Sequence, residues 1–305
     1  MQYPLISEYV NAIIDSGDNL DKLSNLKPVM DSYGEPVHSS GAFAVVFKMV
    51  DNISGRNYAL KCFTTDQPGR LAAYAKISAE IENIKSKYLI SVKYYDKELF
   101  VSSACTDETE FPVLLMDWVD GVTMESYIPG HFQSTSDMSW LTYRFCELAA
   151  WLHEQNFAHG DMKPDNIMVK PDGSLVLIDY DSMYVPAMHG EKSPTLGSRD
   201  YSHPLRKTED FNEGIDDFTI TAMALSLKAI SLDPKVYTEY GTADGMILTM
   251  TDYLDLGKSK KMTALCKYLS DPEFCRLYGN FLIAYDQKDL SLHSFRNLLV
   301  SKPSK

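Results

Sequence analysis

The chain has 305 residues, 45% of them hydrophobic, and a formal net charge of −13 at pH 7. This length and apolar content suit one two-part enzyme or two modest domains, and they exclude a disordered chain. The acidic surface repels polyanions, so we expect no general nucleic-acid binding.

Targeting and redox features of the sequence indicate a cytoplasmic protein with no membrane partner. Residues 1–20 carry acids and no basic leader, unlike a signal peptide. No apolar run approaches the roughly 20 residues that a membrane-spanning helix needs. The five scattered cysteines form no CxxC pair, which is typical of reduced thiols: Cys62, Cys105, Cys146, Cys266 and Cys275.

The first third of the chain is expected to hold a helical extension and a small β-rich lobe, which we place at residues 1–30 and 31–118. Apolar residues recur at helical spacing within residues 5–15. Residues 43–50 and 58–63 are rich in strand-forming residues and flank a turn segment, which predicts a hairpin. Further elements are then expected in this order: a helix at 66–86 and strands at 91–103 and 111–119.

The remainder, residues 119–305, is expected to form a larger helical lobe. Residues 138–155 have the apolar pattern of an amphipathic helix. Residues 166–179 form a second hairpin around the turn Pro171-Asp172-Gly173. Residues 216–230 are largely apolar, which predicts a buried helix. The predicted fold class is therefore α+β, with a small β-rich lobe followed by a larger helical one.

The strongest chemical signal is the segment from His159 to Asn166, followed by a hairpin that ends at Asp179. Phosphoryl transfer needs hard oxygen ligands for a metal ion, a carboxylate that orients the attacking hydroxyl, and cations that offset the developing charge. Asp161 and Asn166 share one loop, and the hairpin returns Asp179 beside it. A turn that is merely rich in Asp and Asn is the alternative, but the spacing of the whole set disfavours it.

This segment resembles the catalytic loop H-R-D-x-K-x-x-N of the eukaryotic-like Ser/Thr protein kinase superfamily, with Gly160 in place of the Arg. The resemblance implies a two-lobed protein-kinase-like fold that uses ATP and Mg²⁺. It also implies that Asp161 positions the substrate hydroxyl or accepts its proton, and that Lys163 neutralises the phosphate in transit. Asn166 and Asp179 would hold Mg²⁺.

Asp179-Tyr180-Asp181 is similar to the family's D-F-G at the Asp and the aromatic residue, but not at the Gly. If the strand continues through Asp179, residues 179 and 181 point to one side, and two converging carboxylates favour a cation between them. Asp181 is therefore a third candidate metal ligand. Capping of the turn after the hairpin is an equally good interpretation. This stretch and Tyr-Ser-His-Pro are also similar to a bacterial subgroup of uncharacterised kinase-like proteins.

The first lobe matches the family less fully. The region of Gly41 and Phe43 stands where the family has its glycine-rich loop, although only one of the usual glycines remains. Lys61, in Ala-Leu-Lys on the next strand, resembles the lysine that grips the α and β phosphates. Its expected ion-pair partner is a glutamate on the following helix. Glu80 lies beside the apolar stripe and is preferred over Glu82.

Further residues are assigned to the nucleotide through the same resemblance. Val46 and Ala59 would line one side of the adenine pocket and Met168 the other. Backbone groups of the hinge, including Asp117 and Val119, would bind the adenine. Ordinary core packing is the alternative interpretation for all of these residues.

The downstream segment 196–204 resembles the end of an activation segment, with Ser-His-Pro in place of Ala-Pro-Glu. Asp216 matches the family's Asp that supports the catalytic loop, and a simple helix N-cap is its alternative. Gly160 cannot make the usual arginine–phosphate pair, so activity is expected not to depend on phosphorylation of Ser193, Thr195 or Ser198.

The sequence favours a kinase that acts on Ser or Thr hydroxyls of a protein substrate, because Lys163 matches the Ser/Thr-specific pattern. Two alternatives remain open. His-Gly-Asp also resembles small-molecule kinases of the aminoglycoside and choline kinase type. The loop that keeps only one of the usual glycines is compatible with a pseudokinase scaffold that binds nucleotide without turnover.

Overall fold

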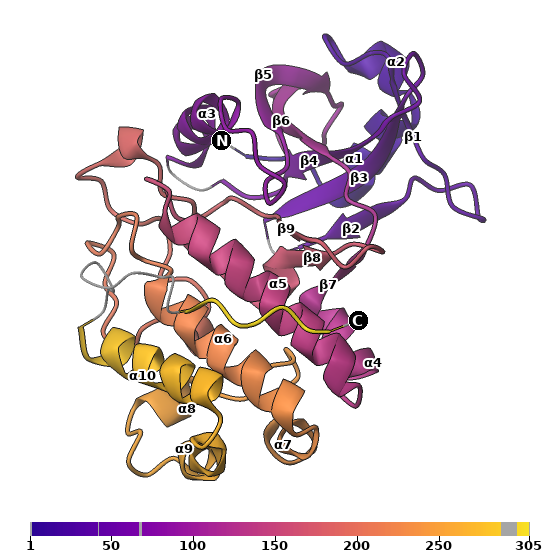
Figure 1. The fold of residues 1–305 in the computed structure, drawn as a ribbon. Helices are drawn as coiled ribbons and strands as arrows, with labels where there is room; N and C mark the ends of the chain where they lie inside the picture. Colours follow the sequence, from indigo (N-terminus) through magenta and orange to yellow (C-terminus); the bar gives the residue numbers. More distant parts are fainter. Residues whose placement is uncertain (1, 42, 67–68, 288–297, 305) are drawn as a thin grey trace. The chain divides into compact units, whose positions relative to one another are not determined.

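The computed structural model describes residues 2–41, 43–66, 69–287 and 298–304. The chain forms two compact units: an N-terminal unit of residues 1–85 and 90–119, and a C-terminal unit of residues 86–89 and 120–305. The α+β class expected from the sequence is confirmed, with strands concentrated in the first unit and helices in the second (Figure 1).

The N-terminal unit is built on an antiparallel sheet with strand order β1-β3-β4-β6-β5, and β2 pairs with β3. The predicted hairpin is confirmed, since β3 and β4 pair from Ala44 opposite Phe63 to Val50 opposite Asn57. The bounds are β1 Leu26–Pro28, β2 His38–Ser40, β3 Ala44–Asp51, β4 Asn57–Phe63, β5 Val92–Phe100 and β6 Glu110–Asp117. The expected helical extension is not separate from this sheet, because it supplies β1.

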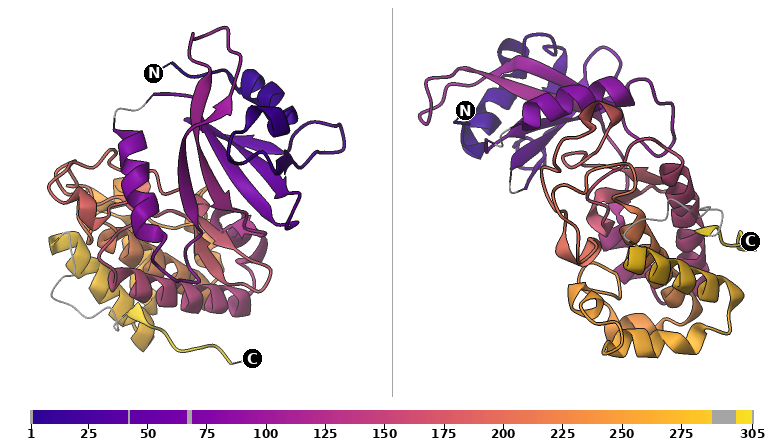
Figure 2. Two further views of the ribbon diagram at one scale, coloured as in Figure 1. Left: turned by 90° about the horizontal axis from the view of Figure 1, so that it is seen from above. Right: turned by 90° about the vertical axis from the view of Figure 1, so that its left-hand side faces the viewer.

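Three helices accompany this sheet (Figure 2): α1 Ile6–Ile14, α2 Ser16–Asn19 and α3 Arg70–Ile81. The helix predicted at 66–86 is confirmed as α3, with shorter bounds. It begins at Arg70 because its N-cap residue, Gly69, has a left-handed backbone that is not helical. The buried face of α3 comprises Arg70, Tyr74, Ile77 and Ile81. Its Ser78 Oγ donates to the Val92 carbonyl at 2.8 Å, which fixes the helix against β5.

The C-terminal unit is centred on α6, which spans Asp217–Leu232 and is buried along almost its whole length, as the apolar pattern predicts. Helices α5 and α10 both pack against α6. The helices of this unit are α4 Met124–His131, α5 Thr135–His153, α6, α7 Lys235–Tyr240, α8 Met250–Tyr253, α9 Lys260–Leu265 and α10 Pro272–Gln287. Short 3-10 turns occur at Pro164–Asn166, Pro186–Met188, Arg199–Tyr201 and Cys266–Tyr268.

A small second sheet, with order β7-β8-β9, carries the loops of chemical interest. Its strands are β7 Val122–Thr123, β8 Ile167–Val169 and β9 Leu175–Leu177. The second predicted hairpin is confirmed as β8–β9, and its turn is closed by the Gly173 amide donating to the Lys170 carbonyl at 2.7 Å. Within the described part of the chain, no helix combines the length and the apolar character needed to cross a membrane.

Candidate active site

The loop from His159 to Asn166 is held in place by Asp216, at the start of α6. The Asp216 carboxylate accepts the backbone N–H of His159 at 2.5 Å and that of Gly160 at 2.9 Å. No side-chain cap is formed at this helix start, so Asp216 supports the loop rather than capping α6. Burial raises the pKa of Asp216, while the charge of Arg206 and the two backbone hydrogen bonds oppose that rise.

His159 fixes the other side of the same loop. Its Nε2 lies 2.8 Å from the Ile178 carbonyl, so Nε2 carries the proton and donates it. Its Nδ1 then accepts the backbone N–H of Asp161 at 3.4 Å. The imidazole is fully buried. The loop is therefore anchored to the chain beyond β9 as well as to α6.

Asp161, Lys163 and Asn166 are brought together by this loop. The Asn166 amide nitrogen donates to the Asp161 carbonyl at 2.8 Å and lies 3.4 Å from its Oδ2. Lys163 Nζ lies 3.7 Å from Asp161 Oδ2 and 3.0 Å from Asp165 Oδ2. Burial lowers the pKa of Lys163, but the neighbouring Asp165, Asp161 and Asp179 carboxylates outweigh it, so the pKa lies above its usual value. The lysine is thereby kept charged beside the Asp161 carboxylate.

The hairpin strand ends earlier than expected. Strand β9 stops at Leu177, and Asp179 has a left-handed φ of +63°. The argument that residues 179 and 181 lie on one side of an extended strand is therefore wrong, because the chain is not extended at Asp179. Tyr180 is buried and its hydroxyl donates to the Leu177 carbonyl at 2.9 Å, which turns the chain back on itself. Asp181 as a metal ligand stays a prediction without that geometric support.

A contact that sequence reasoning missed joins Asp161 to the downstream segment. The backbone N–H of Ser198 donates to Asp161 Oδ1 at 2.8 Å. Gly197, immediately before it, has a φ of +70°, and a Cβ there would lie 3.2 Å from the same Oδ1. Glycine suits this position because it tolerates the backbone angle and the close approach. The only signal in the sequence was the Gly-Ser pair within the segment that resembles an activation segment.

In the N-terminal unit, three of the residues assigned to the nucleotide share one face of the sheet. Val46 is the cross-strand partner of Lys61, and Ala59 lies two residues before Lys61 on β4. Cross-strand partners, and residues two apart on a strand, point to the same face. Met116, opposite Ala59 on β6, extends this face toward the expected hinge.

Lys61 is buried, and its ammonium lies 3.2 Å from the Tyr74 hydroxyl and 5.8 Å from the centre of the Tyr74 ring. Tyr74 belongs to the buried face of α3, a role that the sequence analysis did not assign to it. Glu80 is half-buried and Glu82 is exposed. The pairing of Lys61 with Glu80 stays a prediction.

The remaining N-terminal candidates occupy the hairpin tip and the end of β6. Gly41 donates its N–H to the Ala44 carbonyl at 2.9 Å, and the Phe43 side chain is exposed. Ala42, part of the same expected loop, lies outside the described residues. The Asp117 carboxylate accepts a hydrogen bond from the Ser91 N–H at 3.1 Å. The roles of Gly41, Phe43, Asp117 and Val119 in nucleotide binding stay predictions.

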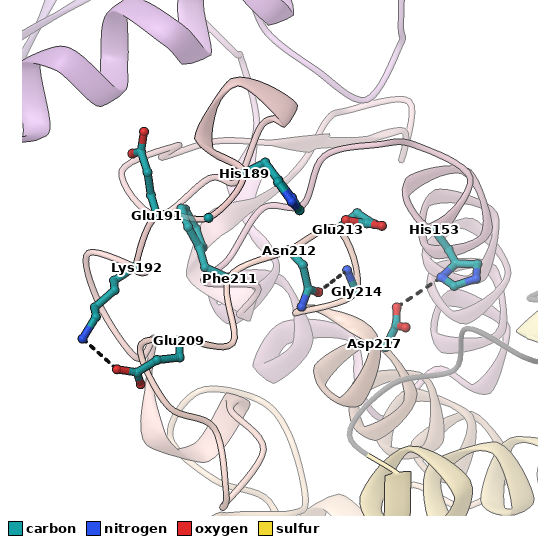
Figure 3. A pocket seen from close by; sticks show the side chains of 11 residues that line it. His153, His189, Glu191, Lys192, Glu209, Phe211, Asn212, Glu213, Gly214 and Asp217 are labelled. Atoms are coloured by element: carbon teal, nitrogen blue, oxygen red, sulfur yellow. Dashed lines mark hydrogen bonds and ion pairs between the residues drawn. The ribbon is translucent and has the colours of Figure 1, made fainter.

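The C-terminal unit also holds Met168 and a cavity. Met168 lies on β8, opposite Thr123 and Val176, and is half-buried. A cavity of about 760 Å³ (Figure 3) contains none of the predicted site residues. Its lining consists of His153, His189, Gly190, Glu191, Lys192, Glu209, Phe211, Asn212, Glu213, Gly214 and Asp217.

The sequence of this chain matches a known protein family. The family model described as "Protein kinase domain" matches residues 39–232, which is more than half of the 305-residue chain. The chain belongs to the protein kinase family.

Relatives share modest identity with it. A probable serine/threonine-protein kinase MRK1 homolog of Encephalitozoon cuniculi is 28% identical over 203 residues, which are 65% of this chain and 60% of that protein. Mitogen-activated protein kinase kinase kinase 19 of Homo sapiens is 26% identical over 165 residues, 52% of this chain and 12% of that protein. An Aurora kinase of Eremothecium gossypii is 24% identical over 117 residues, 37% of this chain and 32% of that protein. The chain thus spans less than two thirds of each of these relatives.

Proposed function

We propose that this chain is an ATP- and Mg²⁺-dependent phosphotransferase that acts on Ser and Thr hydroxyls of a protein substrate. The observation that carries the proposal is the cluster of Asp161, Lys163 and Asn166 on one loop whose backbone is held by Asp216. Phosphoryl transfer depends mainly on positioning and on electrostatic stabilisation. The loop held by Asp216 would supply the positioning, and Lys163 would supply the charge.

Asp161 is the residue that orients the substrate hydroxyl and accepts its proton. Its carboxylate is fixed by Asn166 on one oxygen and by the Ser198 N–H on the other. Lys163 stays charged beside it and offsets the negative charge that develops on the transferred phosphoryl group. The substrate hydroxyl would replace or share the Ser198 contact on Oδ1.

The donor set suits Mg²⁺. Asn166 turns its amide nitrogen toward Asp161, so its carbonyl oxygen is directed elsewhere. By resemblance to the family, the amide oxygen of Asn166 and the carboxylates of Asp179 and Asp181 would be the hard oxygen ligands that Mg²⁺ prefers. When bound, the metal neutralises charge on the nucleotide phosphates.

Lys61 would hold the phosphates of ATP, with Val46 and Ala59 on the same sheet face against the adenine. The further nucleotide contacts belong to the proposal through resemblance to the family: Gly41, Phe43, Glu80, Asp117, Val119 and Met168. Lys163 and the names of several relatives, which are serine/threonine-protein kinases, support Ser/Thr specificity. The five free cysteines support a cytoplasmic location.

The experiment is incubation of the chain with γ-labelled ATP and Mg²⁺, with generic protein substrates and with aminoglycosides and choline as separate acceptors. Label on Ser or Thr of a protein, itself included, is expected, and Asp161→Asn should abolish it. Label on a small molecule would replace the proposal with a small-molecule kinase. ATP binding with no transfer to any acceptor would leave a pseudokinase.

A further inference from the structure

Gly160 occupies a position where no side chain fits. Its φ is +80°, and a Cβ built on it would lie 2.0 Å from the Ser182 carbonyl oxygen and 2.8 Å from the Ser182 carbonyl carbon. Both atoms belong to the backbone, so neither moves aside as a flexible side chain would. The arginine found at this position in many protein kinases is therefore excluded here by the path of the chain, and any cation in this region must come from elsewhere.

Arg206 supplies that cation from the opposite side of the loop. Its Nη1 donates to the Gly160 carbonyl at 3.0 Å, and its Nη2 lies 3.4 Å from Ser193 Oγ. One guanidinium therefore touches both the catalytic loop and the segment that precedes Gly197. Burial lowers the pKa of Arg206 below its usual value, and the nearby carboxylates of Asp216, Asp161 and Asp210 offset part of that shift.

Ser193 is buried and begins a series of hydrogen bonds that leads to Asp161. Its Oγ donates to the Thr195 carbonyl at 2.6 Å. Thr195 Oγ1 accepts the Gly197 N–H at 3.1 Å and lies 3.1 Å from Ser182 Oγ. The next N–H, that of Ser198, donates to Asp161. The segment from Ser193 to Ser198 is thus tied at one end to Arg206 and at the other to the catalytic carboxylate.

Residues 192 and 193 also contact residues 208 and 209, which follow Arg206 in the sequence. The Ser193 N–H donates to the Thr208 carbonyl at 2.7 Å. Lys192 Nζ lies 2.8 Å from Glu209 Oε1, an ion pair drawn in Figure 3. The ion pair is exposed and contributes little stability. The guanidinium of Arg206, which is largely shielded from water, is the stronger connection because its hydrogen bonds are charge-assisted.

We propose that Arg206 is a positioning residue that joins the catalytic loop to the segment Ser193–Ser198 and keeps that segment ordered without phosphorylation. In kinases switched by phosphorylation, new pairs between an arginine and a phosphorylated residue order the activation loop. Here the serine hydroxyl and the Gly160 carbonyl take the place of the phosphate as acceptors for the guanidinium. The inference rests on the proposed function for its effect on catalysis, but not for its effect on the segment.

Hydrogen–deuterium exchange of the amides of residues 193–198 tests the structural part without any catalytic turnover. Arg206→Met keeps an unbranched apolar stem and removes the guanidinium with its charge, and it should speed exchange of these amides by about tenfold or more. Exchange in α10 should stay unchanged. The matched control is Lys207→Met, which removes the neighbouring exposed charge and should leave the segment as protected as in the wild type. Equal exchange in Arg206→Met and the wild type would overturn the proposal.

Kinetics test the positioning role. Arg206→Met should lower kcat by about tenfold or more while KM for Mg-ATP stays within about twofold, because the nucleotide contacts are untouched. Arg206→Lys should recover part of kcat and part of the protection of residues 193–198 from amide exchange. It restores the positive charge but not the two N–H groups that donate in different directions. If Arg206→Met does not fold, the exchange and kcat of Arg206→Lys decide the question in the same way.

Phosphatase treatment of the wild-type protein tests whether a phosphate orders residues 193–198. Wild-type protein stripped of phosphate, as checked by mass spectrometry, should keep its exchange pattern and its kcat. Loosening of residues 193–198 by this treatment would show that a phosphate, not Arg206 alone, orders the segment. If the wild type is inactive but Arg206→Met speeds amide exchange of residues 193–198, the proposed function is wrong and this inference is supported. If the wild type is active and Arg206→Met changes neither exchange nor kcat, the proposed function is supported and this inference is wrong.

Discussion

The ammonium of Lys61 on β4 lies 3.2 Å from the hydroxyl of Tyr74 on α3, and both side chains are buried. A phenol is a neutral hydrogen-bond partner, so it orients an ammonium without cancelling its charge. The residue of α3 described in contact with Lys61 is thus a tyrosine, whereas the sequence directed attention to the glutamates further along the same helix.

Tyr74→Phe removes this hydrogen bond and little else. The change should raise KM for Mg-ATP or lower kcat, for a combined loss of roughly three- to tenfold in kcat/KM, which corresponds to about 1 kcal/mol. Steady-state kinetics measure it, and Tyr33→Phe, at a tyrosine that is 90% exposed, is the control. A normal Tyr74→Phe enzyme together with a strongly impaired Glu80→Gln would restore the glutamate as the partner of Lys61.

Removal of the charged groups assigned to catalysis, phosphate binding and metal binding should strongly lower phosphoryl transfer. Asp161→Asn and Lys61→Met should each lower the rate of phosphoryl transfer by about 10² or more, because each removes positioning or charge stabilisation in the transition state. Asp179→Asn should also weaken binding of Mg-nucleotide. Transfer to a protein acceptor and nucleotide binding are measured separately. A variant Asp161→Asn with undiminished transfer would remove Asp161 from the mechanism.

Asp181→Asn separates a metal role from a structural one. If Asp181 binds Mg²⁺ or a metal-bound water, the Mg²⁺ concentration for half-maximal activity should rise severalfold, while the melting temperature without metal stays level or rises. Activity titrated with Mg²⁺ and thermal denaturation give the two readings. An unchanged Mg²⁺ dependence with a lowered melting temperature would make Asp181 a structural residue of the turn.

Gly160→Ala should be strongly destabilising, because its Cβ would meet the Ser182 carbonyl oxygen at 2.0 Å with the backbone at a φ of +80°. Gly279→Ala is the control within α10, where a Cβ would meet no atom of the described residues within 4 Å and a helical Gly costs about 0.5–1 kcal/mol relative to Ala. Denaturant unfolding should therefore show the two substitutions moving stability in opposite directions. A Gly160→Ala protein as stable as the wild type would mean that the loop can take another path.

Glu273 on α10 makes the stability of the folded chain depend on pH in the acid range. Burial works against its ionised form, but the ion pair with Lys228 on α6 at 2.7 Å and the Ser301 N–H at 2.6 Å lower its pKa to about 2. Because this folded pKa lies below the unfolded value, the stabilisation is present above about pH 4.5 and is lost as the pH falls toward 2.

Melting temperatures between pH 7 and pH 2.5 measure this effect. Glu273→Gln should melt lower than the wild type at pH 7, and the gap should narrow as the pH falls through this window. Glu35→Gln, at an exposed loop residue, should track the wild type throughout. A gap between Glu273→Gln and the wild type that does not change with pH would assign the loss to packing instead.

Local sequence pattern was enough to predict the two hairpins, α6 and the loop from His159 to Asn166. The hairpins β3–β4 and β8–β9 follow from strand-forming runs around a turn, and α6 follows from an apolar run of helical length. These signals are local, since each depends on residues within about 25 positions of one another. The spacing from His159 to Asn166 likewise needs only one loop, so a motif in the sequence could identify it.

Tertiary structure alone decided which distant residues complete the site. Ser198 reaches Asp161 across 37 positions, and Arg206 reaches Gly160 across 46. Such contacts form only when packing brings separate segments together, and nothing in the local periodicity of either segment encodes them. The same is true of Asp179: β9 ends before it, its backbone is left-handed, and the alternation expected of a strand does not apply there.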